Sequence, residues 1–128
     1  MSTELNMLAC SAILTLILAF PSVMALIVAR GLAFAAGNRD EPFELPAWGE
    51  RAQRAHRNMI ENLPVFAALV LIAQVAGVSN EATELGAILF FWGRIAHAVT
   101  YLAGIPYLRT AAFGVSFAGM LIIALEIL

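Results

Sequence analysis

The stretch "MLACSAILTLILAFPSVMALIVA", residues 7–29, decides the fold of this chain. It contains no charged residue, and as a helix rising about 1.5 Å per residue it is long enough to cross a hydrocarbon core about 30 Å thick. The whole composition agrees, because 62% of the residues are hydrophobic and only 12% are charged, whereas soluble domains contain about a quarter charged residues. The sequence therefore predicts an all-α membrane protein.

Three further apolar segments follow, and together the segments predict one four-helix domain over residues 1–128. The helices are expected at about 7–34, 54–77, 84–104 and 109–128. No basic region precedes the first segment and no cleavage motif of small residues follows it, so we expect a retained helix. The connections "GVSNEATE" and "AGIPYLR" are short, which favours a four-transmembrane-helix bundle with antiparallel neighbours.

The basic residues are distributed unevenly along the chain, and all seven are arginines. Six of them lie at the first or third connection: Arg30, Arg39, Arg51, Arg54, Arg57 and Arg109. The N-terminus, the second connection and the C-terminal end carry only glutamates as charged side chains. Since arginine-rich loops stay in the cytoplasm, both termini are predicted to face away from it. The net charge of -2 provides no basic face, so no nucleic acid partner is expected.

The most polar stretch, "ERAQRAHRNMIENLP", leads into the second apolar segment. At about 100° per residue, Arg54, Asn58 and Glu61 fall within a sector of about 60° on one helix face. Arg57 flanks this sector, whereas His56 points nearly opposite. We therefore expect a polar stripe at the entry of this helix.

A second polar group lies inside the third apolar segment, where Arg94, His97 and Tyr101 share a helix face. Arg94 falls near the middle of the span. Leaving an arginine at that depth in lipid costs about 2.5 kcal/mol or more. We therefore expect its side chain to face protein, water or a ligand.

These polar residues fit two interpretations. In the first, Arg54 and Glu61 pair with Arg94 and its neighbours and only hold the helices together. In the second, they form a pocket for a molecule that carries both carboxylates and an amine, because guanidinium groups bind carboxylates and Glu61 can bind an ammonium group. Glutathione has this set of groups, and other zwitterions share it.

The motif "RAHRNMIENLP" resembles a signature of the MAPEG superfamily, the membrane-associated proteins in eicosanoid and glutathione metabolism. The matching positions are Arg54, Ala55, His56, Asn58, Glu61 and Pro64. The resemblance extends to "RIAHAVTYL", through Arg94, His97 and Tyr101, and to Arg109 at the start of the fourth segment. It covers nearly the whole chain and includes its length and its four-span layout.

The resemblance implies a homotrimer of four-helix protomers, with glutathione bound as co-substrate between neighbouring subunits near the cytoplasmic side. It implies a catalytic role for Arg109 beside the glutathione sulfur, and no metal ion is expected. It also implies a set of glutathione-binding residues: Arg54, Asn58, Glu61 and Tyr101, with Arg94, Arg57, His97 and Arg30 as further candidates. Phe113 and Asn62 stand where eicosanoid-synthesising branches have tyrosines, so eicosanoid synthesis is not implied.

With this resemblance, the sequence predicts an integral membrane glutathione transferase or peroxidase. Arg109 and the positive end of the fourth helix would stabilise the glutathione thiolate. The thiolate would then attack a lipophilic small molecule, either an electrophile or a lipid hydroperoxide arriving from the membrane lipid. Thr110 could donate a hydrogen bond to the sulfur, or satisfy backbone groups at the helix start.

Two other classes of function remain open from the residues alone. One is a non-catalytic membrane scaffold in which the arginines form structural pairs. The other is a small transporter or channel subunit in which Arg94 and His97 line a path.

Overall fold

The computed structural model describes residues 1–128 and contains only helices. They are α1 (Thr3–Arg30), α2 (Leu32–Ala36), α3 (Ala47–Val75), α4 (Glu81–Ala103) and α5 (Pro106–Ile127). All except α2 are long and apolar enough to cross a membrane. The prediction of an all-α fold with four spans is confirmed, and the chain has the layout of a multi-pass integral membrane protein.

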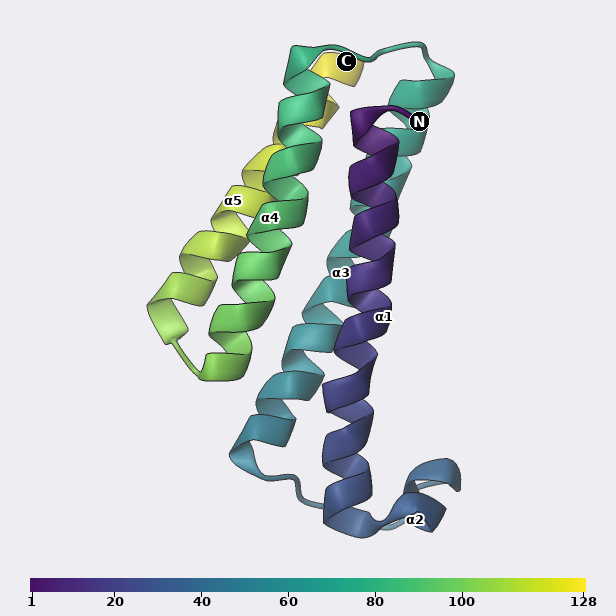
Figure 1. Ribbon diagram of the computed structural model, residues 1–128, viewed down its shortest axis with the longest axis vertical. Helices are drawn as coiled ribbons and strands as arrows, with labels where there is room; N and C mark the ends of the chain where they lie inside the picture. Colours follow the sequence, from purple (N-terminus) through teal and green to yellow (C-terminus); the bar gives the residue numbers. More distant parts are fainter.

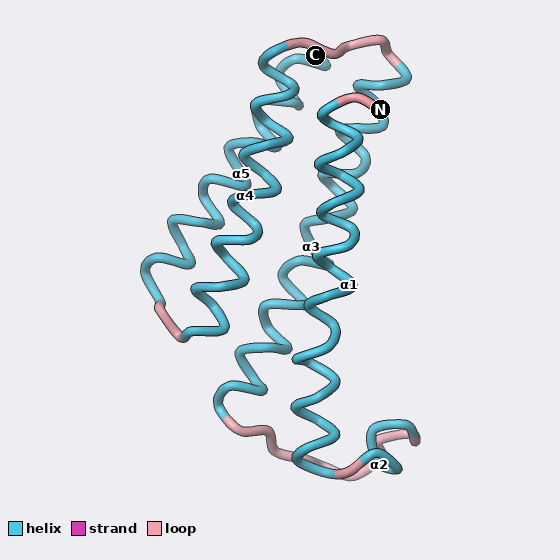
Figure 2. Tube along the Cα trace, in the orientation of Figure 1, coloured by secondary structure: helices cyan, strands magenta, loops and turns pink.

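The four long helices form two antiparallel pairs that lie side by side (Figure 1). In one pair α1 packs against α3, in the other α4 packs against α5, and contacts of α4 with α1 and α3 join the pairs. Both termini and the α3–α4 turn lie at one end of the bundle, whereas α2 and the α4–α5 turn lie at the other. Figure 2 shows that the α4–α5 connection is short, whereas a longer loop leads from α2 to α3.

Small residues allow α4 and α5 to approach closely. A Cβ atom added at Gly93 would lie 2.8 Å from the backbone nitrogen of Ser116, and one added at Gly86 would lie 2.7 Å from the carbonyl oxygen of Gly119. No side chain fits at these distances, so only glycine allows the two backbones to come so near. Close packing of small residues is a common way for membrane helices to associate.

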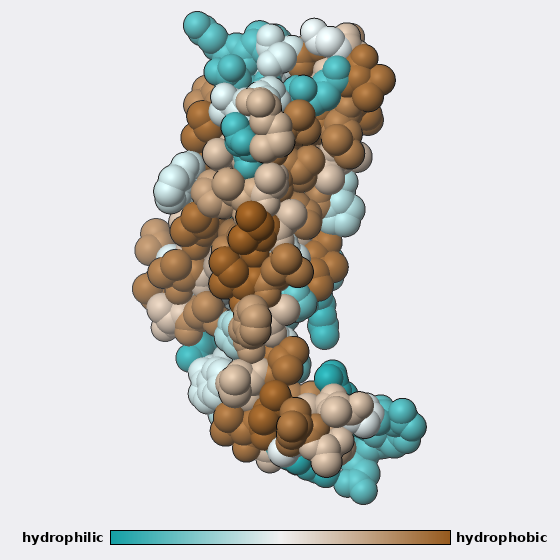
Figure 3. All heavy atoms as spheres, turned by 45° about the vertical axis from the view of Figure 1, so that its right-hand side comes forward, coloured by the Kyte–Doolittle hydropathy of each residue, from teal (hydrophilic) through white to brown (hydrophobic).

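The interior of the bundle is small, and most large apolar side chains point outward. Phe66 of α3 and Phe90 of α4 stack with their ring centroids 3.8 Å apart, and Leu18 and Met59 belong to the same buried cluster. Outside, Phe20 of α1 is 72% exposed, and apolar residues cover much of the visible face in Figure 3. This outer surface suits lipid, because lipid tails are as apolar as the side chains themselves.

The helix boundaries differ from the predicted ones mainly by four residues at each end of the first helix and by seven residues at the start of the second span. The first helix ends at Arg30 instead of reaching residue 34, because Gly31 has a φ of 85° and turns the chain into the separate α2. The helix α3 begins at Ala47, well before the predicted start at residue 54, directly after the extended Pro46. The polar stretch before the second span is therefore helical, and the span and the stretch form one continuous helix.

Polar contacts hold the end of the bundle that carries the termini. Asn80 caps α4 by accepting hydrogen bonds from the backbone N–H groups of Ala82 and Thr83. The buried Glu4 accepts hydrogen bonds from the hydroxyl groups of Ser79 and Thr83. These contacts tie the start of α1 to the α3–α4 turn and to the first turn of α4. Local sequence patterns do not predict them, because Glu4 is separated by 75 positions from Ser79 and by 79 positions from Thr83.

Arg30 organises the connection between α1 and α3 at the opposite end. Its guanidinium donates to the carbonyl oxygen of Pro42 at 3.0 Å and to the Glu41 carboxylate at 2.8 Å. The same group lies 4.2 Å from the centre of the Phe34 ring, which packs edge-on against Phe43. The connection is therefore folded back on the end of α1.

Candidate functional site

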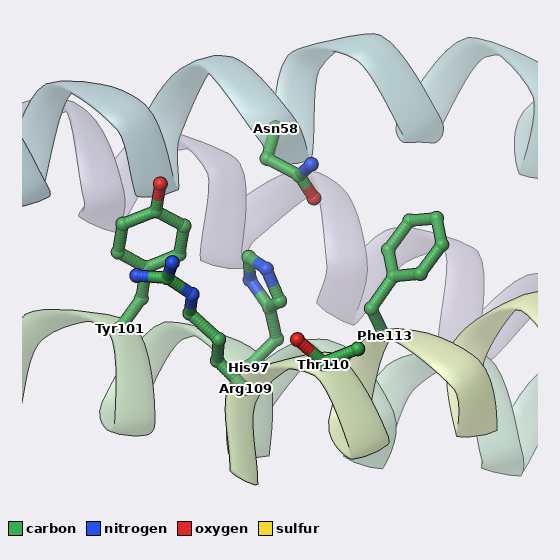
Figure 4. Close-up of a pocket in the computed structure, with 6 residues that line it drawn as sticks. All are labelled: Asn58, His97, Tyr101, Arg109, Thr110 and Phe113. Atoms are coloured by element: carbon green, nitrogen blue, oxygen red, sulfur yellow. The ribbon is translucent and has the colours of Figure 1, made fainter. Parts of the chain in front are cut away.

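A pocket of about 240 Å³ lies between α3, α4 and α5, toward the end of the bundle with the α4–α5 turn (Figure 4). It is lined by Asn58, His97, Tyr101, Arg109, Thr110 and Phe113. In Figure 4, Asn58 reaches from α3 across the pocket toward the other residues, which all come from α4 and α5. The pocket combines polar groups with the aromatic rings of Tyr101 and Phe113.

A larger hollow on the surface of α1 has a volume of about 460 Å³, but its chemistry is different. Its lining consists only of apolar side chains: Leu16, Ala19, Phe20 and Val23. None of these side chains can donate or accept a hydrogen bond. We interpret it as part of the lipid-facing surface and take the smaller polar pocket as the candidate site.

Arg109 brings a positive charge to the pocket near the start of α5. Its guanidinium carbon lies 4.5 Å from the centre of the Tyr101 ring, a distance at which a cation is attracted to the ring face. The only ion pairs in the chain are Arg30–Glu41 and Arg54–Glu50, so no carboxylate neutralises Arg109. The unpaired N–H groups at the start of α5 add positive potential nearby. An anion in the pocket would therefore meet a net positive environment.

Arg94 lies directly behind the pocket and is only 1% exposed. Its Nη2 donates to Oδ1 of Asn58 at 2.6 Å, and its Nε and Nη1 atoms are buried without a hydrogen-bond partner. A buried guanidinium that is neither paired nor fully hydrogen-bonded is costly. The charge of Arg94 is thus held next to the pocket with no protein anion to balance it.

His97 closes the inner side of the pocket and is 4% exposed. Its ring lies edge-on to Tyr101, with centroids 5.3 Å apart, and its Nδ1 lies 3.4 Å from Nη2 of Arg94. Because a guanidinium only donates hydrogen bonds, Nδ1 must be the acceptor in this contact. This contact favours the neutral His97 tautomer that carries its ring proton on Nε2.

The structure brings four of the predicted site residues into one pocket: Asn58, His97, Tyr101 and Arg109. Arg94 is a neighbour of this group and does not line the pocket. Three predicted residues of α3, Arg54, Arg57 and Glu61, are exposed and lie outside the pocket of the single chain. Arg30 is also outside it and is paired with Glu41.

The interhelical ion pairs of the first sequence interpretation are absent from the chain. Arg94 contacts no carboxylate, and the side chain of Arg54 lies 3.8 Å from Glu50 on its own helix, with both groups largely exposed. Such an exposed pair contributes little to stability. The arginines of α3 and α4 therefore do not hold these helices together through ion pairs.

The structure shows which hydrogen bonds two further residues, Thr110 and Asn62, form at the pocket. Thr110 lines the pocket, and its hydroxyl donates to the carbonyl oxygen of Pro106 at 3.3 Å, so it also satisfies a backbone group. Asn62 donates through Nδ2 to the backbone oxygen of Asn58 at 2.8 Å and to Oδ1 of Asn58 at 3.4 Å. Its spacing of four residues from Asn58 on a helix was the signal that could have revealed this contact.

The fold and the pocket define a class: a helical multi-pass membrane protein with a positively charged pocket between its last three spans. A family model described as "MAPEG family" matches residues 7–128, nearly the whole chain. The chain belongs to the MAPEG family, and the resemblance seen in the sequence is confirmed. This family includes glutathione transferases and peroxidases and also members without enzymatic activity. A search of curated proteins found no match.

Proposed function

We propose that this protein is a membrane glutathione transferase or peroxidase that works as a homotrimer. The observation that carries the proposal is the guanidinium of Arg109, which lies over the Tyr101 ring in a polar pocket without a carboxylate partner. Membership of a family related to glutathione metabolism supports glutathione as the co-substrate. The pocket then receives the cysteinyl part of the tripeptide, with its sulfur near Arg109.

The size of the pocket supports a site shared between protomers. Its volume of about 240 Å³ is smaller than the roughly 300–1,000 Å³ typical of pockets that enclose a small-molecule ligand. One protomer therefore surrounds only part of glutathione. The exposed polar stripe of Arg54, Arg57 and Glu61 supplies groups for its carboxylates and its ammonium group once a second protomer covers this surface.

Arg109 acts on the protonation of the glutathione thiol. A thiol with its ordinary pKa of about 8.5 is only a few per cent ionised at neutral pH, and lowering that pKa to about 6.5 takes about 2.7 kcal/mol. A unit charge about 4 Å away supplies about 4 kcal/mol at an effective dielectric constant near 20. One guanidinium near the sulfur is therefore sufficient, and the start of α5 adds to its effect.

The thiolate then reacts with a lipophilic substrate, a reaction that serves detoxification. With an electrophile, the sulfur forms a bond to carbon and the leaving group departs with the electron pair. With a lipid hydroperoxide, the sulfur attacks the terminal oxygen, the O–O bond breaks, and the alkoxide leaves with the electron pair and takes a proton from water to become the alcohol. The resulting sulfenic acid condenses with a second glutathione to give the disulfide and water. Phe113 forms an apolar wall of the pocket for such a substrate.

The distribution of arginines between the two ends of the bundle supports one orientation in the membrane. The pocket lies toward the end of the bundle with the α4–α5 turn and α2, where six of the seven arginines are found. Arginine-rich ends of spans remain in the cytoplasm, which contains the glutathione pool. We therefore place the site near the cytoplasmic side and both termini on the other side.

The proposal is tested with the purified full chain in lipid nanodiscs. We expect saturable glutathione binding by calorimetry, a mass of three times the 13.7 kDa chain, and thiol conjugation to a lipophilic aryl halide or reduction of a lipid hydroperoxide. Glutathione binding without turnover of any such substrate would contradict the proposed enzymatic activity. Absence of both binding and protection by glutathione against heat would favour the scaffold, and solute flux in liposomes without conjugation would favour the transporter.

A further inference from the structure

The turn between α4 and α5 connects two residues of the pocket but receives little support from packing. Residues 103–108 are all exposed, and the turn joins Tyr101 near the end of α4 to Arg109 near the start of α5. Figure 4 shows these two side chains next to each other, and the guanidinium carbon of Arg109 lies 4.5 Å from the centre of the Tyr101 ring. Their contact therefore depends on what fixes the turn.

The end of α4 leaves one carbonyl group without a backbone partner. Two backbone N–H groups of the turn donate to the carbonyl oxygens of Thr100 and Tyr101. The carbonyl oxygen of Leu102 receives no backbone hydrogen bond, because Pro106, four residues later, has no N–H group. The last turn of α4 also contains no basic residue that could interact with its carbonyl groups. The donor for such a group at a helix end has to come from elsewhere.

Arg51 of α3 supplies this donor. Its Nε donates to the carbonyl oxygen of Leu102 at 3.4 Å, and no other hydrogen bond joins α3 to this turn. The guanidinium also packs against the backbone of Gly104, because a Cβ atom added there would lie 3.4 Å from both Nε and Cζ of Arg51. Arg51 is partly buried and pairs with no carboxylate. Its positive charge is favourable at the carboxyl end of α4.

We infer that Arg51 is a positioning residue that fastens the α4–α5 turn to α3 and so holds Arg109 over Tyr101 in the pocket. Arg51 does not line the pocket, so it acts through the turn and not on a ligand. Since α3 also supplies Asn58, this contact joins the side of the pocket formed by α3 to the side formed by α4 and α5. The effect on glutathione chemistry rests on the proposed function, whereas the attachment of the turn rests on the contacts of Arg51 alone.

Hydrogen exchange tests the attachment without any ligand. Arg51→Met keeps an unbranched side chain but places a methyl group where Arg51 has Nε, whereas Arg51→Gln places an amide nitrogen there. In lipid nanodiscs, the hydrogen-bonded amides of Gly104 and Ile105 should exchange about fivefold faster in Arg51→Met, as expected for the loss of one hydrogen bond. In Arg51→Gln the increase should stay below about twofold. Because Arg51 is partly exposed near the start of α3, both variants should fold.

Arg39→Met is the matched control, because Arg39 also donates through Nε to a carbonyl oxygen near the end of a helix. Its partner is Ala35 of α2, at 2.8 Å. This variant should leave the exchange of the α4–α5 turn unchanged. An unchanged exchange rate in Arg51→Met, or an equal increase in Arg39→Met, would overturn the inference. The same holds if Arg51→Gln exchanges as fast as Arg51→Met.

Thiolate chemistry tests the positioning of Arg109. If Arg51→Met lets Arg109 move away from the sulfur, the pH midpoint of the ultraviolet thiolate absorbance of bound glutathione should rise by about one unit. Turnover at pH 7 should then fall about threefold, while the Kd of glutathione changes less than about twofold. In an Arg109→Leu background, the same substitution should change turnover less than about 1.5-fold. Equal effects in both backgrounds would show that Arg51 does not act through Arg109.

The two measurements separate this inference from the proposed function. If the natural protein binds no glutathione, the proposed function fails, and hydrogen exchange still decides whether Arg51 fastens the turn. If glutathione binds and the turn of Arg51→Met exchanges faster while the thiolate midpoint stays the same, Arg51 holds the turn without positioning Arg109, and the inference is wrong.

Discussion

Arg109 is the residue on which the proposed chemistry of the pocket depends. It lies over the Tyr101 ring, and no carboxylate competes with a ligand for its charge. The other basic group nearby, Arg94, is buried and bonded to Asn58. The two guanidinium groups therefore differ in position, since Arg109 lines the pocket and Arg94 is bonded to a residue that lines it.

Replacing Arg109 by leucine should separate chemistry from binding. We expect glutathione to remain bound within about tenfold, because other groups hold its carboxylates and ammonium. Turnover at pH 7 should fall about 25-fold, because a thiol pKa that returns from about 6.5 to about 8.5 lowers the thiolate fraction from about three quarters to a few per cent. The ultraviolet thiolate absorbance of bound glutathione at pH 7 should vanish as well. Arg109→Lys keeps the charge and should retain most of this signal. Lost binding with an unchanged thiolate signal per bound ligand would make Arg109 a carboxylate ligand instead.

Glu61 allows a second test at the scale of one residue. It is exposed and forms no ion pair in the single chain, so Glu61→Gln should leave the thermal stability unchanged. Glutathione affinity should fall about 10- to 150-fold if Glu61 meets the ammonium group through a charge-assisted hydrogen bond of about 1.5–3 kcal/mol. Calorimetry that finds less than a threefold change would remove Glu61 from the site.

At the scale of the elements, the contact between α4 and α5 positions the site. Three of the pocket residues, Arg109, Thr110 and Phe113, belong to α5, whereas His97 and Tyr101 belong to α4. The backbones of these helices meet at Gly93 and Gly86. Any change that separates the helices should therefore widen the pocket.

The substitution Gly93→Ala tests this contact. The added methyl group would lie 2.8 Å from the backbone nitrogen of Ser116, which should destabilise the protein by about 1–3 kcal/mol through overpacking. Gly114→Ala on α5 is the matched control, because a Cβ atom there meets nothing within 4 Å and alanine favours the helix. Thermal unfolding in the same lipid nanodiscs should rank Gly93→Ala below the natural protein and Gly114→Ala at or above it. Equal stability of both variants would contradict this account.

At the scale of the whole molecule, the distribution of arginines predicts the orientation in the membrane. Both termini lie at one end of the bundle and α2 lies at the other. In a Cys10→Ala background, which removes the single native cysteine, a cysteine placed at Glu81 should react with an impermeant reagent added outside the cell. A cysteine placed at Asp40 should react only after the membrane is opened. Labelling of position 40 from outside would reverse the proposed orientation.

The sequence by itself determined the features that depend on local composition and helical period. Four uncharged or nearly uncharged segments of sufficient length require four spans, because unpaired backbone groups are not tolerated in lipid. The period of the helix placed Arg94, His97 and Tyr101 on one face, and the structure puts all three toward the interior. The motif around Asn58 was sufficient to identify the family.

The tertiary structure alone decided how these local features meet. Of the predicted polar stripe of α3, Asn58 lies inside the pocket and Glu61 lies outside it. The sequence did not predict this division, because the residues on one helix face do not specify which neighbouring helix packs against that face. The bond between Arg94 and Asn58 joins residues 36 positions apart, and no local pattern specifies such a contact. The distance between α4 and α5, and with it the place of Arg109 beside Tyr101, follows from backbones that touch at Gly93 and Ser116. Packing of this kind depends on the shapes of two helices together, which neither segment contains alone.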